Sequence, residues 1–323
     1  MTGRVAECGP AGGGLAGGGS GGSGPARRHV LIDGVIEPAD GRHLSAYDRG
    51  FQLGDGVFET LRARGGRPTE LAEHLARLRR SAEGLDIELG DDLEREVEAG
   101  IAALLDADGL AGPDGDASIR ITVTRGPVLA RGLLPAVPVR PTVVIQAWPV
   151  PPTPADHLDQ GLHLVVSAVR RDPSNPLAAL KTISRADYVY ARLEARRAGA
   201  DDALFLTVDG LLSEATSANV FFLRGDRLAT PALDCAILPG TTRSWILGWG
   251  AAAGLVPMEG AFTPDDLRAA DEAFLCSSVA GILPVTRFEG AAIGDGRPGP
   301  WTRRAREARE AFIRGEGSGG GPA

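Results

Sequence analysis

The sequence has 323 residues, of which 43% are hydrophobic and 24% charged, and its formal net charge is −8. This is the composition of a soluble globular protein with room for two domains, and the acidic balance without a basic stripe argues against nucleic-acid binding. No apolar run reaches the roughly 18 residues of a membrane span. The cysteines Cys8, Cys235 and Cys276 are far apart, so we expect a reducing, cytoplasmic location and no metal site.

The two ends of the chain consist largely of glycine, alanine and serine. Such segments cannot bury enough apolar surface to offset the entropy lost on ordering. We therefore predict that residues 1–28 and 315–323 are disordered tails, and that the folded part spans residues 29–314.

The first half of the folded part is predicted to form an N-terminal α/β lobe over residues 29–147. Residues 29–38 have two short apolar runs around Asp33-Gly34, which indicates a hairpin. From residue 71 onward, apolar residues recur every three or four positions, which predicts an amphipathic helix that ends near Gly84. Strands are expected at 117–126 and 141–150.

The proline-rich segment 148–157 is predicted to link this lobe to a C-terminal lobe over residues 158–314. Strands and helices mix in both halves without strict alternation, so we predict an α+β fold of two lobes and not a doubly wound sheet. The elements expected in the second lobe are strands at 162–169, 203–210 and 219–223, helices at 184–199, 241–254 and 302–315, and a strand-turn-strand unit at 272–290.

Lys181 is the only lysine among the 34 lysines plus arginines of the chain. Arginine is effectively always protonated, whereas a lysine in a dry site can lose its proton and act as a nucleophile. The alternative is an ordinary surface lysine. The other polar motifs of the chain decide between these two interpretations.

Glu214 stands among small polar residues between two apolar segments, in "DGLLSEATSANVFF". It is either a solvated turn residue or a carboxylate held by Ser213, Thr216 and Asn219 and directed at a cationic ring nitrogen.

Two turns rich in hydroxyl groups follow. In "LPGTTRSWIL", Thr241 and Thr242 begin a helix, where backbone N–H groups and hydroxyls can bind an anion or simply cap the helix. "CSSVAGILPV" forms a second small-residue turn after a strand, with Ser278 in it.

These motifs occur in an order that resembles the class IV pyridoxal-phosphate (PLP) aminotransferases of fold type IV. The family includes branched-chain aminotransferases, D-amino-acid transaminases, R-selective amine transaminases and aminodeoxychorismate lyases. The resemblance implies the two-lobed fold of D-amino-acid aminotransferases and PLP as the cofactor. It rests on the blocks "YDRGFQLGDGVFETLR", "HLARL", "LKT", "SEATSANVF", "LPGTTR" and "CSSVAGILPV".

The resemblance also implies roles for individual residues. Lys181 is expected to be the catalytic residue that bonds covalently to PLP and moves the proton of the substrate. Glu214 is expected to pair with the pyridine nitrogen and keep it protonated. The residues expected to hold the cofactor phosphate are Arg77, Thr241, Thr242 and Ser278.

The candidate substrate-binding residues are Phe58, Arg131, Arg185 and Val279. Branched-chain enzymes usually have a tyrosine and a "GTA" turn where this chain has Leu53 and "SSV". D-amino-acid transaminases typically have a tyrosine and "PRNH" where it has Phe58 and "ARGLLP", which keeps Arg131. Arg185 lies one helical turn after Lys181 and is either a substrate or cofactor contact or a surface arginine.

The resemblance leads to a PLP transaminase that works by a ping-pong mechanism as the main hypothesis. An amino donor, including D-amino acids or R-amines, gives its nitrogen to the cofactor, and a 2-oxo acid collects it, in what we expect to be a homodimer. The alternative is an aminodeoxychorismate lyase that forms 4-aminobenzoate and pyruvate, which "KTISR" and the two "RG" pairs favour. A non-catalytic anion- or nucleotide-binding module is a third hypothesis, but it leaves Lys181 and Glu214 without a role.

Overall fold

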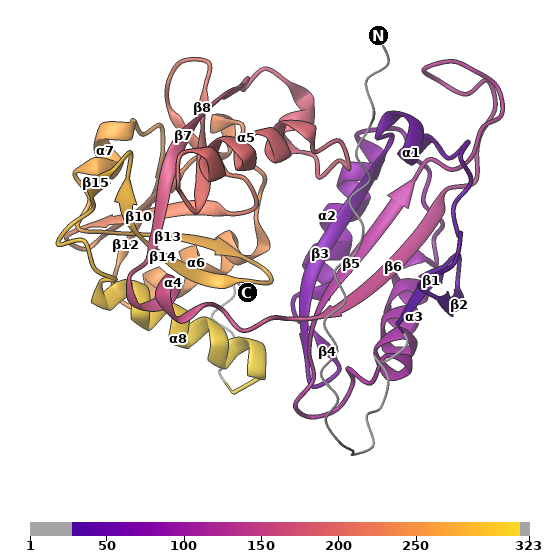
Figure 1. Ribbon diagram of the computed structural model, residues 1–323, viewed down its shortest axis with the longest axis horizontal. Coiled ribbons are helices and arrows are strands. Elements are labelled where there is room, and N and C mark those ends of the chain that lie inside the picture. Colours follow the sequence, from indigo (N-terminus) through magenta and orange to yellow (C-terminus); the bar gives the residue numbers. More distant parts are fainter. Residues whose placement is uncertain (1–27, 317–323) are drawn as a thin grey trace, which may run out of the picture.

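The computed structural model describes residues 28–316 of the chain. These residues form two lobes, each built on its own β-sheet (Figure 1). The predicted tails, apart from Arg28, Gly315 and Glu316, lie outside the described residues. No helix among the described residues is long and apolar enough to cross a membrane.

The first lobe has a six-stranded sheet in the order β2-β1-β6-β5-β3-β4, in which all neighbours are antiparallel. The strands are β1 (His29–Ile32), β2 (Val35–Pro38), β3 (Gly56–Arg64), β4 (Arg67–Pro68), β5 (Asp116–Thr124) and β6 (Thr142–Pro149). The helices are α1 (Arg49–Leu53), α2 (Leu71–Glu83) and α3 (Leu93–Ala107).

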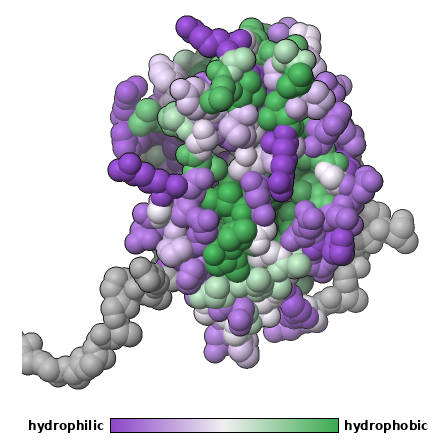
Figure 2. Space-filling view, turned by 90° about the vertical axis from the view of Figure 1, so that its right-hand side faces the viewer, coloured by the Kyte–Doolittle hydropathy of each residue, from purple (hydrophilic) through white to green (hydrophobic). Residues whose placement is uncertain are grey.

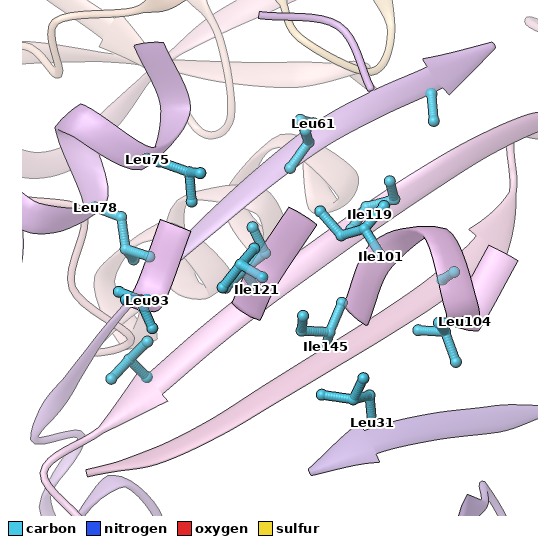
Figure 3. Packing of buried hydrophobic residues seen from close by; sticks show 14 of the residues in the cluster. Leu31, Leu61, Leu75, Leu78, Leu93, Ile101, Leu104, Ile119, Ile121 and Ile145 are labelled. Atoms are coloured by element: carbon cyan, nitrogen blue, oxygen red, sulfur yellow. The ribbon is translucent and has the colours of Figure 1, made fainter. Parts of the chain in front are cut away.

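Helices α2 and α3 pack on one face of this sheet and form the core of the lobe with it. Leu75 and Leu78 of α2 and Ile101 of α3 point toward Ile119 and Ile121 of β5 (Figure 3). The hairpin and the first helix are confirmed. Asp33 and Gly34 have φ angles of 48° and 86°, as a two-residue hairpin turn requires, and α2 ends directly before Gly84.

The second lobe has a nine-stranded mixed sheet, which agrees with the predicted α+β class. Its order is β12-β11-β10-β13-β14-β7-β8-β9, with β15 paired to β14. The strands are β7 (Leu162–Arg171), β8 (Asp202–Thr207), β9 (Leu212–Ala215), β10 (Asn219–Arg224), β11 (Arg227–Pro231), β12 (Val256–Gly260), β13 (Glu272–Ser277), β14 (Gly281–Phe288) and β15 (Ala291–Ala292). The α-helices are α4 (Ala155–Asp159), α5 (Ala186–Arg197), α6 (Thr241–Ala252), α7 (Pro264–Arg268) and α8 (Pro300–Arg314), and short 3-10 helices cover Pro176–Ala179 and Leu233–Cys235.

The segment between the two sheets is shorter than the predicted linker. Strand β6 continues through Pro149, and α4 already begins at Ala155. Pro149 fits the end of β6 because only β5 pairs with it there, so its missing N–H group leaves no ladder bond unmade. The irregular connection is therefore residues 150–154.

The outer face of the first lobe has hydrophobic side chains in its middle, surrounded by hydrophilic ones (Figure 2). A cavity of about 740 Å³ lies there between α3 and strands β1, β2 and β6. None of the predicted site residues lines it.

Candidate active site

A cavity of about 450 Å³ is lined by residues of both lobes. The first lobe contributes side chains from α2, β3 and β5. The second contributes the segment before α5, the β9–β10 connection, the start of α6 and the turn between β13 and β14. The cavity brings together the predicted residues Phe58, Arg77, Lys181, Arg185, Glu214, Thr241, Thr242, Ser278 and Val279.

The backbone of Lys181 is hydrogen-bonded to the first lobe, at β3 and α2. Its carbonyl oxygen accepts a hydrogen bond from the Phe58 N–H (2.9 Å), and its own N–H donates to Ser81 Oγ (3.1 Å). Its Nζ lies 4.7 Å from the centre of the Phe58 ring. Burial lowers the pKa of Lys181 to about 8; Glu59 opposes this shift and Arg77 adds to it. Near neutral pH a usable fraction of this amine is therefore uncharged.

We expect an amine-specific reagent such as trinitrobenzenesulfonate to label Lys181 in the cofactor-free protein with a midpoint near pH 8. Because this is the only lysine, its peptide reports one group, and mass spectrometry separates it from the N-terminal amine. The folded chain releases the Lys181 proton at a lower pH than the unfolded chain does. The contribution of Lys181 to stability therefore becomes more favourable as the pH rises from about 8 to 10.5.

The same labelling in urea provides the control, since the unfolded chain should give the ordinary midpoint of about 10.4. An equally high midpoint in the folded protein would contradict the claim that the site activates Lys181.

Arg77 lies on α2 and is fixed by a buried network beneath the cavity. Its Nε and Nη2 each donate to one oxygen of Glu59 at 2.7 Å, and His74 Nδ1 lies 2.7 Å from the same carboxylate. Burial alone would raise the pKa of Glu59, but the hydrogen bonds from Arg77 and His74 outweigh it and lower the pKa to about 2. Arg77 Nη1 also donates to the Pro239 carbonyl (2.8 Å), which ties α2 to the turn before α6.

The start of α6 forms a pocket for an anion. The first helical bond runs from Ser244 N–H to the Gly240 carbonyl, so the N–H groups of residues 241–243 have no partner within the helix. Thr241 Oγ1 lies 3.3 Å from both His74 Nε2 and Ser278 Oγ. With Arg77 alongside, this turn provides N–H groups, hydroxyls and positive charge, which suit a phosphate group.

Gly240 makes room for a close contact at this turn. A Cβ atom at this position would lie 2.1 Å from Asn219 Oδ1, so any other residue would displace the Asn219 side chain. Asn219 in turn donates to the Leu238 carbonyl (3.1 Å) and holds the turn against β10.

Glu214 is buried in β9, and its partners differ from those predicted. Its Oε2 accepts the Leu238 N–H at 2.8 Å, and its Oε1 accepts the Tyr188 hydroxyl at 3.1 Å and lies 3.5 Å from Arg171 Nη2. Burial raises the pKa of Tyr188, so its hydroxyl remains protonated and available as a donor. This arrangement leaves a carboxylate anchored at the wall of the cavity.

The predicted supports of Glu214 were wrong. Ser213 hydrogen-bonds the Ala236 carbonyl, Thr216 bonds Asp202, and Asn219 bonds Leu238. Neighbouring side chains of a strand point to opposite faces, so Ser213 cannot share the direction of Glu214.

Two arginines lie over Phe58 on another side of the cavity. The guanidinium carbon of Arg120, on β5, lies 3.9 Å from the centre of the Phe58 ring, and that of Arg185 lies 5.8 Å from it. Burial and the nearby charge of Arg185 lower the pKa of Arg120. Within residues 28–316, neither arginine forms an ion pair with a carboxylate. Arg185 also stacks on the Tyr188 ring.

Arg131 does not line the cavity, so its assignment as a substrate residue stays a prediction. It is exposed in the connection between β5 and β6. Arg49 holds this connection, since its guanidinium donates to the carbonyls of Gly132 (3.0 Å) and Leu133. That anchoring sets the path of the loop, which the short "RG" motif does not reveal.

Several residues of the site are absent from the predicted set. They are Glu59, His74, Arg120, Arg171 and Tyr188. A signal was present for His74, because it lies one helical turn before Arg77 on the same face of α2. The others depend on contacts between distant strands and helices.

Comparison with known proteins places this geometry in a family. Residues 56–288 match the family described as amino-transferase class IV. A putative branched-chain-amino-acid aminotransferase of Methanocaldococcus jannaschii is 32% identical over 279 residues, covering 86% of this chain and 94% of the relative. The D-alanine aminotransferase of Bacillus licheniformis is 32% identical over 285 residues, covering 88% and 96%.

Solved structures agree. A branched-chain amino acid aminotransferase from T.th., solved with pyridoxamine 5'-phosphate, superposes with a TM-score of 0.83 at 26% identity, covering 90% of this chain and 95% of that one. The 4-amino-4-deoxychorismate lyase of Pseudomonas aeruginosa gives a TM-score of 0.74 at 33% identity, covering 86% and 97%. The chain belongs to the class IV aminotransferase family, whose cofactor is PLP, and the predicted two-lobed fold is confirmed.

The residues of the cavity fit this cofactor. One wall has an amine of lowered pKa, another has an anchored carboxylate, and the start of α6 with Arg77 provides donors for a dianion. The space of about 450 Å³ is in the range of small-molecule sites.

Proposed function

We propose that this protein is a PLP-dependent transaminase that moves an amino group between an amino acid and a 2-oxo acid by a ping-pong mechanism. The observation that carries the proposal is the convergence of Lys181, Glu214 and the start of α6 on one cavity. The cavity also contains two arginines that have no carboxylate partner among residues 28–316. The amine, the carboxylate and the anion pocket serve the cofactor, and the two arginines serve the substrate.

In this proposal each residue acts through a group identified above. When bound, PLP supplies an electron sink for the substrate carbon. Lys181 Nζ, neutral in part near pH 8, is the nucleophile and then carries the proton. Glu214 holds the proton on the pyridine nitrogen, supported by the Leu238 N–H. The phosphate is held by Arg77, Thr241, Thr242 and Ser278.

Arg120 and Arg185 point to the chemical class of the substrate. The charge of Arg185 lowers the pKa of Arg120, so the two guanidinium groups repel each other. A bound carboxylate would relieve this repulsion while forming charge-assisted hydrogen bonds. A simple amine lacks that carboxylate. The site therefore favours amino acids, of either hand, and 2-oxo acids over R-amines.

Removing either arginine should weaken the binding of carboxylate substrates. For Arg120→Met and Arg185→Met we expect the KM for a 2-oxo acid to rise about 10- to 100-fold, the size of a hydrogen bond between charged groups. The change in kcat should be small. Steady-state kinetics with pyruvate and 2-oxoglutarate measure both constants.

Arg95→Met is the matched control, because Arg95 is an exposed arginine on α3 that pairs with Asp92 outside the cavity. It should leave KM unchanged. If both cavity variants also kept the wild-type KM, the assignment of a carboxylate substrate to this side would be wrong.

A lyase that forms 4-aminobenzoate and pyruvate is the second candidate. Arg185 in "KTISR" favours it, as does the Pseudomonas aeruginosa lyase, which is 33% identical to this chain. A substrate with two carboxylates would use both arginines. The two candidates share the cofactor residues and differ in whether turnover needs a 2-oxo acid acceptor.

We also infer a cytoplasmic homodimer with no nucleic-acid partner. Cys235 and Cys276 are buried free thiols, which suits a reducing compartment. The exposed apolar side chains Phe51, Leu133 and Leu134 support an interface with a second copy. Light scattering during size-exclusion chromatography tests the dimer, and a monomer alone would contradict it.

A further inference from the structure

Arg309 of α8 is a fully buried arginine that reaches the cavity wall from behind. Its Nη2 donates to Glu70 Oε2 and, at 3.2 Å, to Thr242 Oγ1. Its guanidinium carbon lies 5.1 Å from the ring centres of both Trp245 and Phe312. In Figure 1, α8 (yellow) runs under the second lobe to the boundary with the first.

Burying a cation is unfavourable unless its charge is paired and its N–H groups are hydrogen-bonded. The Nε and Nη1 of Arg309 have no hydrogen-bond partner within the described residues, so the guanidinium is only partly satisfied. Glu70 is the N-cap residue of α2 and has a left-handed φ of 54°. Its side chain makes no hydrogen bond to the first turn of the helix. The carboxylate turns toward Arg309 instead.

This contact joins the two halves of the anion pocket. Glu70 precedes α2, which carries Arg77, and Thr242 lies in the first turn of α6. Arg309 therefore sets the position of α6 relative to α2. Because it occupies one lone pair of Thr242 Oγ1, the hydroxyl hydrogen of Thr242 is left free to donate into the cavity.

We propose that Arg309 is a positioning residue for the cofactor phosphate. It orients the hydroxyl of Thr242 and locks the start of α6 against α2 through Glu70. This inference rests on the proposed function, in which Thr242 binds the phosphate. It assigns a role to a residue that does not line the cavity.

The neighbouring residue provides a matched control. Glu310 also connects α8 to the first lobe, through an ion pair with Arg62 Nη1 (2.9 Å), but it does not touch Thr242 or line the cavity. In Glu310→Gln, Arg62 keeps its second partner, Asp116. This variant removes a contact between the lobes without affecting the anion pocket.

The test compares two ligands of the cofactor-free full chain, PLP and pyridoxal, which lacks the phosphate. Arg309→Met alone would leave Glu70 unpaired, so the variant is the double substitution Glu70→Gln with Arg309→Met. We expect its Kd for PLP, measured by visible absorbance, to rise about tenfold, the effect of one charge-assisted hydrogen bond. Its Kd for pyridoxal should stay at the wild-type value, and Glu310→Gln should change neither.

Thr242→Val separates failure of this inference from failure of the proposed function. Suppose that Thr242→Val weakens the binding of PLP but not of pyridoxal, while the double variant binds both ligands as the wild type does. Then the role of Arg309 is overturned and the proposed function is not. An equal rise of the Kd values for PLP and pyridoxal in the double variant would also overturn this role, because it indicates a general structural effect. If Thr242→Val has no effect on PLP either, the phosphate site itself is misassigned.

Discussion

Replacing Lys181 by alanine is expected to lower the rate of amino transfer by about 10⁴-fold or more, the upper range for a positioned acid–base group that is also the nucleophile. No other residue of the chain can replace it, because Lys181 is the only lysine. Borohydride treatment followed by mass spectrometry provides a second measurement. The cofactor should become fixed to the peptide that contains Lys181 in the wild type and to no peptide in the variant.

Lys181→Arg separates the loss of the nucleophile from the loss of positive charge. It keeps a positive charge of similar reach in a pocket that already holds Arg77 and Arg185, but arginine does not release its proton. We expect it to be as inactive as the alanine variant. Substantial turnover by either variant, or fixation of the cofactor elsewhere, would contradict the assignment of Lys181.

Replacing Glu214 by glutamine should lower kcat by about 10²- to 10³-fold while the cofactor stays bound, in the range seen when a single electrostatic contact is removed. Glutamine has the same shape, and its carbonyl oxygen can still accept the Leu238 N–H. What it loses is the negative charge that keeps a ring nitrogen protonated. Single-turnover absorbance with an amino acid measures the chemical step directly.

Tyr188→Phe tests whether the rate depends on the charge of Glu214 or on the hydrogen bonding around it. It removes the hydroxyl that donates to Glu214 at 3.1 Å but retains the aromatic ring and the charge of the carboxylate. A small loss of rate is expected. If Glu214→Gln turned over nearly as fast as the wild type, the electronic role of Glu214 would be refuted.

Much of the candidate site could be predicted because short motifs determine local geometry. The helix that starts at "GTTR" leaves its first N–H groups without helical partners, whatever the helix packs against. The resemblance of several sequence blocks to one family predicts that the residues of these blocks line one site. All predicted residues except Arg131 line the same cavity. The roles assigned to them remain predictions that the experiments above test.

The supports of these residues could not be predicted, because they come from distant parts of the chain. Tyr188 meets Glu214 across 26 residues, and Arg309 meets Glu70 across 239. Such pairs depend on how α5 and α8 dock, for which the sequence has no local signal. Arg131 lies on the β5–β6 connection away from the cavity of its own chain, and its assignment to the substrate stays a prediction.

In the fold too, local elements could be predicted from the sequence, whereas contacts between distant segments could not. The β1–β2 hairpin and α2 follow from turn residues and periodicity, and both are observed. Helix α3 is missing from the predicted elements, although its buried residues Val97, Ile101 and Leu104 recur at helical spacing. The order of strands in the sheets was beyond prediction because pairing joins segments far apart in the sequence.

One measurement tests the central claim most directly: the amount of 2-oxo acid released when the loaded enzyme is mixed with an amino donor in the absence of any acceptor. A panel of D-alanine, L-leucine and L-glutamate identifies the donor. A transaminase should release about one equivalent per active site, then stop, and resume only when a 2-oxo acid is added. Continued release of pyruvate from aminodeoxychorismate without an acceptor would contradict the transaminase and establish the lyase.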